Sequence, residues 1–174
     1  DIRPWLSHRT KNLSAVKAFL QGAQYRWRMQ PGGEQYFRKA VELDSSFITA
    51  RTWLISCLVL RGHPAEAKEH QAFLLRHLFD AGPFEQALIR WTGALIGGNM
   101  PAQAKALEEA LEYSPNNNVL IYLLADIRCS QEEYAAAVQV IRPAVESGWA
   151  FQPASLILGT SLFQLRDYAG SRRV

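Results

Sequence analysis

The stretch LIYLLADIRCSQEEYAAAVQVI, residues 120–141, decides the fold of this chain. Its apolar residues return every three or four positions on both sides of a polar break at residues 130–132. This spacing places apolar side chains on one face of an α-helix, whereas a half-buried strand would show strict alternation. The stretch therefore predicts two consecutive helices joined by a short turn.

The same helical spacing recurs from about residue 13 to the end of the chain, and few segments alternate with period two. Glycine, proline and polar residues interrupt it at intervals, and each interval predicts a helix of roughly 11 to 16 residues. The predicted fold class is therefore all-α. The breaks fall at residues 32–33, 44–46, 62–64, 80–82, 97–99, 115–118, 130–132, 147–148 and 166–167.

Single positions also recur at a fixed distance along the chain. A period of this length is typical of stacked helical pairs, because one pair cannot bury its apolar face alone. Three positions recur 34 residues later: Leu124 as Leu158, the turn residue Glu132 as Arg166, and Tyr134 as Tyr168.

The chain resembles the tetratricopeptide (TPR) repeat family, whose pattern runs Leu-Gly-x-x-Tyr, Gly-x-Tyr-x-x-Ala, Phe-x-x-Ala and Pro. The segment YFRKAVELD, residues 36–44, matches the second helix of such a repeat. The resemblance implies a right-handed solenoid of antiparallel helix pairs, with about four and a half to five repeats. Further matching residues are Leu54, Gly62, Ala67, Gly98, Leu107, Ala110, Leu124, Ala125, Tyr134, Ala137, Leu158 and Gly159.

The repeats divide the chain unequally. Residues 1–12 do not repeat, so we expect a lead or linker there, followed by the repeat array over residues 13–174. Residues 168–174 would begin a second helix, so we expect a truncated last repeat in a fragment of a longer protein. The uncovered face of that repeat would then associate with another copy, or its final segment would be mobile.

Two departures from the repeat pattern are visible. Gly22 and Tyr25 lie one residue too close to Phe37 and Ala40, which predicts a shortened turn around residues 31–33. Gln71 is polar where the pattern expects a large apolar residue. These departures concern local geometry and leave the prediction of an array unchanged.

The charge distribution leaves one alternative function open. The net charge is +3, yet residues 1–40 contain eight Lys and Arg against two acidic residues, a local balance of +6. Such a basic end suits an acidic partner, including a nucleic acid. It lacks a recognition helix motif, a zinc spacing or an RNA-binding signature.

Targeting and compartment signals are weak. No apolar run reaches the roughly 18 residues that a membrane span needs, so no membrane interaction is expected. Cys57 and Cys129 each lie inside an apolar helical pattern, where buried free thiols are commoner than a disulfide. This favours a reducing cytoplasm.

No residue constellation predicts catalysis, a cofactor or a metal. His63, His70 and His77 are seven residues apart, which is about 10 Å along a helix and too far to share one zinc ion. Adjacent glutamates such as Glu108 and Glu109 point to different helix faces. The turn glycines lack the preceding strand and the lysine of a phosphate loop. We therefore expect a protein that is not an enzyme.

TPR arrays typically bind peptide segments or partner helices in a groove lined by the first helix of each pair, so the resemblance implies a partner-binding groove. This lining is mostly apolar and offers Arg26 as its one basic residue, so we expect an apolar or aromatic-bearing ligand, possibly from the same polypeptide. The implied lining residues are Phe19, Arg26, Thr52, Ser56, Val59, Leu88, Thr92, Leu95, Tyr122, Asp126, Leu156, Thr160 and Phe163.

Two functions remain for test. The first is a protein–protein interaction or scaffold module, similar to TPR regions in bacterial multidomain regulatory proteins. The alternative is nucleic-acid binding through the basic residues 1–40. A third outcome is that no external ligand uses the groove and the array is a spacer.

Overall fold

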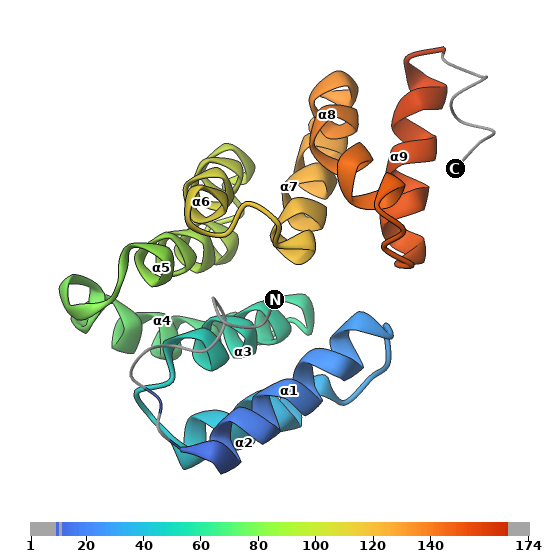
Figure 1. Ribbon diagram of the computed structural model, residues 1–174. Helices are drawn as coiled ribbons and strands as arrows, with labels where there is room; N and C mark the ends of the chain where they lie inside the picture. Colours follow the sequence, from blue (N-terminus) through green and yellow to red (C-terminus); the bar gives the residue numbers. More distant parts are fainter. Residues whose placement is uncertain (1–9, 11, 167–174) are drawn as a thin grey trace. The chain divides into compact units, whose positions relative to one another are not determined.

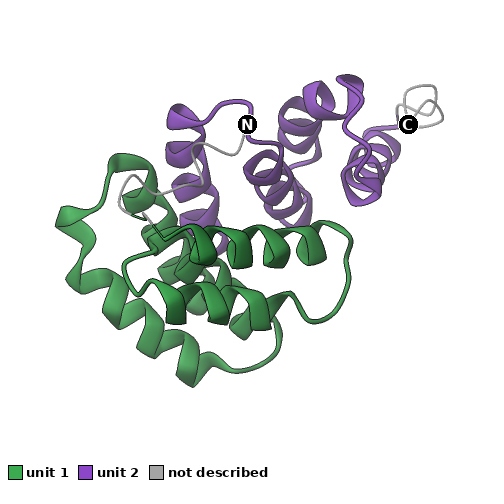
Figure 2. Ribbon diagram, turned by 60° about the horizontal axis from the view of Figure 1, so that its bottom comes forward, with its two compact units in different colours: residues 1–99 green, residues 100–174 purple. Residues whose placement is uncertain are grey.

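The computed structural model describes residue 10 and residues 12–166, and within these residues every regular element is a helix (Figure 1). This confirms the predicted all-α class. The chain forms two compact units, residues 1–99 and residues 100–174, which Figure 2 colours separately. Every described helix is too short or too polar to cross a lipid bilayer.

Where the structure describes the first unit, five α-helices pack as consecutive neighbours. α1 packs against α2 and α3 packs against α4, while α5 contacts both α3 and α4. The contact between α3 and α5 stacks one pair on the next, as a helical repeat requires. The elements are α1 (Leu13–Trp27), α2 (Gly33–Leu43), α3 (Ile48–Leu60), α4 (Pro64–Arg76), the short 3-10 helix η2 (Leu78–Asp80) and α5 (Pro83–Ile96).

Helix α3 forms the centre of this unit. Every residue from Ile48 to Leu58 is buried, because α2, α4 and α5 all pack against it. A helix that is covered on several sides needs no polar face, which explains the apolar sequence ITARTWLISCLVL. The packing around α3 is rich in aromatic rings: Trp53 on α3 lies 6.4 Å from Phe37 and 5.8 Å from Trp91, measured between ring centroids.

In the described residues of the second unit, four helices repeat this arrangement. α6 packs on α7, α7 on α8 and α8 on α9, and α9 also contacts α7. Its apolar cluster contains Ile141 of α8 and Leu158 of α9. The helices are α6 (Met100–Tyr113), α7 (Asn118–Ser130), α8 (Tyr134–Glu146) and α9 (Gln152–Gln164). The predicted second helix after α9 falls at residues 168–174, which lie outside the described residues.

The turns between α3 and α4 and between α7 and α8 use the same backbone conformation. Gly62 has φ +77°, its N–H donates to the carbonyl of Val59, and the next N–H, of His63, donates to Leu58. These two bonds satisfy the last carbonyls of α3 in the Schellman arrangement. Glu132 adopts the same left-handed conformation after α7 at φ +62°, although it is not glycine. The breaks predicted at these positions are confirmed.

The prediction of a shortened turn between α1 and α2 is wrong. Residues 28–32 separate α1 from α2, whereas residues 61–63 suffice between α3 and α4. Met29 and Gly32 both have positive φ, 53° and 100°. The turn between α1 and α2 therefore contains two residues in positive-φ conformations, whereas the turn between α3 and α4 contains one, Gly62.

Helices α1 and α2 approach each other closely at two glycines. A Cβ atom added to Gly22 would lie 2.9 Å from the ring of Phe37 and 3.1 Å from the carbonyl oxygen of Gly33. Phe37 is buried and held by Phe19 at a centroid distance of 5.8 Å, so its ring has little room to move. The pairing of α1 with α2 therefore depends on the absence of a side chain at residue 22.

Replacing Gly22 by alanine should destabilise the protein. Overpacking costs roughly 1–3 kcal/mol, which outweighs the gain of about 1 kcal/mol in helix propensity. The matched control is Gly97→Ala, where the added Cβ meets Gly93 O at an ordinary 3.5 Å and φ is −79°. Urea unfolding of both variants checks this, and an unchanged midpoint for Gly22→Ala would show that the two helices can separate freely.

Candidate partner-binding site

The structure separates the predicted groove positions of the first unit into two groups. Phe19, Thr52, Ser56, Leu88 and Thr92 are buried. The side chains of Thr52, Ser56, Leu88 and Thr92 belong to the interior of the unit and cannot reach an external ligand directly, whereas the buried ring of Phe19 lines a pocket described below. A second group, with partly exposed side chains, is Arg26, Val59 and Leu95.

The predicted positions of the second unit are more accessible. Leu156 and Phe163 on α9 are 69% and 57% exposed, and Asp126 and Thr160 are also exposed. Tyr122 is half-buried, because its ring packs edge-on against Phe151 at a centroid distance of 5.0 Å. A partner segment can therefore contact α9 through large apolar side chains.

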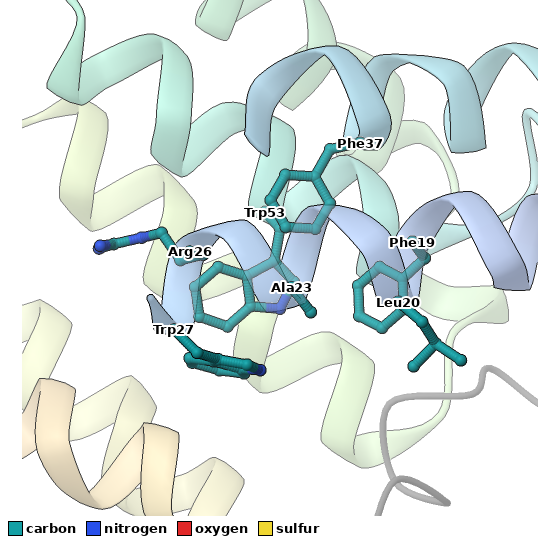
Figure 3. A pocket seen from close by; sticks show the side chains of 7 residues that line it. All are labelled: Phe19, Leu20, Ala23, Arg26, Trp27, Phe37 and Trp53. Carbon is teal, nitrogen blue, oxygen red and sulfur yellow. The ribbon is translucent and has the colours of Figure 1, made fainter. Parts of the chain in front are cut away.

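An apolar pocket of about 70 Å³ opens between α1, α2 and α3 (Figure 3). Two predicted groove residues, Phe19 and Arg26, line it. In Figure 3 the rings surround Ala23, and the charged end of Arg26 points away from them. We call this site the apolar pocket; it is lined by Phe19, Leu20, Ala23, Arg26, Trp27, Phe37 and Trp53.

A second pocket of about 170 Å³ shares Arg26 with the first. Most of its other lining comes from the turn between α1 and α2 and from the ends of α2 and α3. We call it the polar pocket; its lining is Arg26, Gln30, Pro31, Gly32, Gly33, Glu34, Cys57, Leu60 and Arg61.

The charges in the polar pocket are unevenly paired. Glu34 accepts from Arg61 and from Arg38, each at 2.9 Å. Burial raises the pKa of this carboxyl, but the two arginines outweigh it and hold the pKa below its usual range. Arg26, by contrast, has a buried Nε without a hydrogen-bond partner. The pocket therefore offers one positive charge whose hydrogen bonding is incomplete.

Cys57 lines the polar pocket but is poorly suited to nucleophilic chemistry. Burial raises the pKa of its thiol to about 11, and the nearby arginines only partly oppose this. The thiolate is the reactive form, so at neutral pH the thiol is largely protonated and inert. Cys57 and Cys129 are both free cysteines.

A buried polar network explains the unexpected Gln71. Its Nε2 donates to the carbonyl of Ile89 at 2.9 Å, and its Oε1 accepts from Thr92 Oγ1 at 2.7 Å. Gly93 leaves the room, since a Cβ there would lie 3.1 Å from Gln71 Nε2. Thr92, a predicted groove residue, is thus part of the contact between α4 and α5.

His70 on α4 belongs to a second network, which includes side chains of α2 and α3. Arg51 contacts His70 Nδ1 at 2.9 Å and stacks its guanidinium 3.9 Å from the ring centroid of Phe73. His70 Nε2 lies 3.7 Å from Glu66, which also pairs with Arg38. Burial and the charge of Arg51 lower the pKa of His70. The imidazole is therefore a neutral acceptor for Arg51.

Sequence reasoning missed most of the apolar pocket. Leu20, Trp27, Phe37 and Trp53 line this pocket but are absent from the predicted groove residues. The available signal was the set of four aromatic residues that α1, α2 and α3 contribute to the pocket, but aromatic residues at such positions are usually core. Aromatic residues that line a binding site differ from core residues only in that a pocket stays open beside them, and this is visible only in the structure.

The helical pairs, their turns and the stacking of α3 with α5 define a TPR-like fold. A solved structure described as MamA protein, which is TPR-like, is similar to this chain, with a TM-score of 0.52 and 18% sequence identity. The match covers 90% of this chain and 86% of the MamA chain. No protein-family model matches the chain, and no curated protein matches it. The comparison therefore shows the fold.

Replacing Thr92 by valine should lower stability. The change leaves Gln71 Oε1 buried without a donor, which costs about 1–3 kcal/mol. Thr160→Val is the matched control, because Thr160 is also a predicted groove residue but is exposed, and such changes stay within about 0.5 kcal/mol. Chemical denaturation measures both, and equal stabilities would contradict an interior role for Thr92.

The stability of the protein should fall as the pH drops from 7 to 5. Because folding lowers the pKa of His70, the folded protein binds fewer protons than the unfolded chain just below the ordinary histidine pKa of about 6.5. The free energy of unfolding therefore decreases with decreasing pH in that window. The carboxyls with lowered pKa values, Glu34, Asp44 and Glu66, contribute only at more acidic pH.

His70→Gln isolates this effect, because glutamine can accept from Arg51 but does not titrate. The difference between the denaturation midpoints at pH 7 and pH 5 should be smaller for His70→Gln than for the wild type. His63→Gln is the control on an exposed histidine. An identical pH dependence in wild type and His70→Gln would assign the effect to other groups.

Proposed function

We propose that this chain is a non-enzymatic protein–protein interaction module that binds an apolar segment of a protein partner. The observation that carries the proposal is a TPR-like fold whose first helices present an open apolar pocket and exposed apolar side chains. Among the described residues, no group of three or more His, Cys, Asp or Glu side chains could hold a metal. The partner is a separate protein or another domain of the same polypeptide.

The regulatory setting is a finer part of the same proposal. The resemblance to TPR regions of bacterial multidomain regulators supports a cytoplasmic scaffold that joins a sensing or output domain to its target. The likeness to MamA protein supports the fold on which such a scaffold would be built.

Nucleic-acid binding ranks below this proposal because part of the basic end is already neutralised. Arg38 bonds both Glu34 and Glu66, so its charge is shared with two carboxylates. A phosphate backbone would have to compete with these contacts. An apolar pocket also gives no advantage in binding a phosphate backbone.

Site-specific photo-crosslinking tests the proposal. A photoreactive phenylalanine analogue at Leu156 should crosslink to a partner that is then identified and prepared separately. The same analogue at Gln139, an exposed residue on α8, serves as the control. Equal crosslinking from both positions would show that the first helices do not form the binding surface.

The affinity of that purified partner gives the quantitative test. Leu156→Asp should weaken binding by about 10-fold or more, because burying a leucine contributes about 1.5–3 kcal/mol. Gln139→Asp changes the charge by the same amount and should alter the dissociation constant by less than about 2-fold. Circular dichroism confirms that both variants fold.

A further inference from the structure

We infer that the apolar pocket and the polar pocket form one site for a peptide that carries a branched aliphatic residue next to an acidic residue. The inference rests on the proposed function and adds the ligand chemistry to it. The aliphatic side chain would occupy the apolar pocket, and the carboxylate would bind Arg26.

The size of the apolar pocket selects the side chain. Its volume is about 70 Å³, roughly half of the 150 Å³ cavity that accommodates benzene in another protein. Leucine, isoleucine or valine fits this space better than a phenyl or indole ring. The walls are the rings of Phe19, Trp27 and Trp53, so the ligand atoms in the pocket must be apolar (Figure 3).

Arg26 supplies the second requirement. Its Nε is buried and has no hydrogen-bond partner, whereas buried donors are nearly always paired. Within the described part of the chain, no carboxylate forms an ion pair with Arg26. A carboxylate is the acceptor that matches a guanidinium best, because it can accept two parallel hydrogen bonds.

The polar pocket provides the space for that carboxylate. Arg26 and Arg61 both line it, and Glu34 is already bonded to Arg61 and Arg38. The pocket is therefore net positive, in agreement with the balance of +6 over residues 1–40. This charge attracts an acidic segment and repels a basic one.

Arg26 also fixes the spacing of the two ligand groups. Its apolar stem lines the apolar pocket, and its guanidinium points away from the aromatic rings, so one side chain belongs to both pockets. An extended peptide advances about 3.3 Å per residue. The aliphatic and acidic residues should therefore be adjacent or separated by one residue.

A library of random 12-residue peptides displayed on phage tests the inference with the full chain as bait. Selected peptides should be enriched in Leu, Ile or Val within two positions of Asp or Glu. Fluorescence polarisation then measures the dissociation constant of the best peptide and of the same peptide with its acidic residue changed to the amide.

Two variants address the two pockets separately. Arg26→Gln should raise the dissociation constant of the acidic peptide by about 10-fold or more, as expected when a charge-assisted hydrogen bond is lost. The peptide whose acidic residue is changed to the amide should bind Arg26→Gln and the wild type with equal affinity. Ala23→Phe fills the apolar pocket from its wall and should also weaken binding. Arg28→Gln removes the same charge two residues away, lines neither pocket and should leave the affinity within about 2-fold.

The outcomes separate this inference from the proposed function. Selected peptides that lack the motif, or that bind Arg26→Gln and Ala23→Phe as well as the wild type, overturn the pocket assignment and leave the interaction module standing. Failure to select any peptide overturns the pocket assignment too, and the crosslinking at Leu156 then decides the proposed function independently. Salt-dependent binding of a DNA or RNA probe that requires Arg26 would assign this residue to nucleic acid and overturn the inference.

Discussion

The indole of Trp53 packs against three other aromatic rings, with centroids 6.0 Å from Trp27, 6.4 Å from Phe37 and 5.8 Å from Trp91. These rings belong to α1, α2 and α5, so one side chain of α3 joins four helices of the first unit. The same indole is a wall of the apolar pocket. The shape of the pocket is therefore fixed by core packing, and a ligand would meet a rigid wall instead of a loop.

Much of the fold could be predicted because its signals are local. The period of 34 residues and the turn residues at Gly62 and Glu132 mark the helix boundaries directly. The turn between α1 and α2 could not be predicted in the same way. Its path depends on positive φ at Met29 and Gly32, and methionine gives no indication of a left-handed conformation.

The candidate site was less accessible to sequence reasoning. Helical spacing selects one face of each first helix, but it does not show that α3 is covered by three neighbours. Thr52 and Ser56 consequently lie inside the protein. Arg26, one of the predicted groove residues, lines both pockets, and its place at the end of α1 follows from the helix alone. The role of Trp53 required the packing of α1, α2 and α3 together.

The hydrogen bond between Gln71 and Thr92 helps to specify the register in which α4 packs against α5. Stacked helical pairs resemble one another, so an apolar contact between α4 and α5 would tolerate displacement by one helical turn. A carboxamide buried between them does not, because a displaced helix would leave its oxygen and nitrogen without partners. A Cβ atom at Gly93 would lie 3.1 Å from the nitrogen of this carboxamide, so the residue facing it has to be small. A single polar residue in an apolar seam thus distinguishes the correct neighbour from otherwise equivalent alternatives.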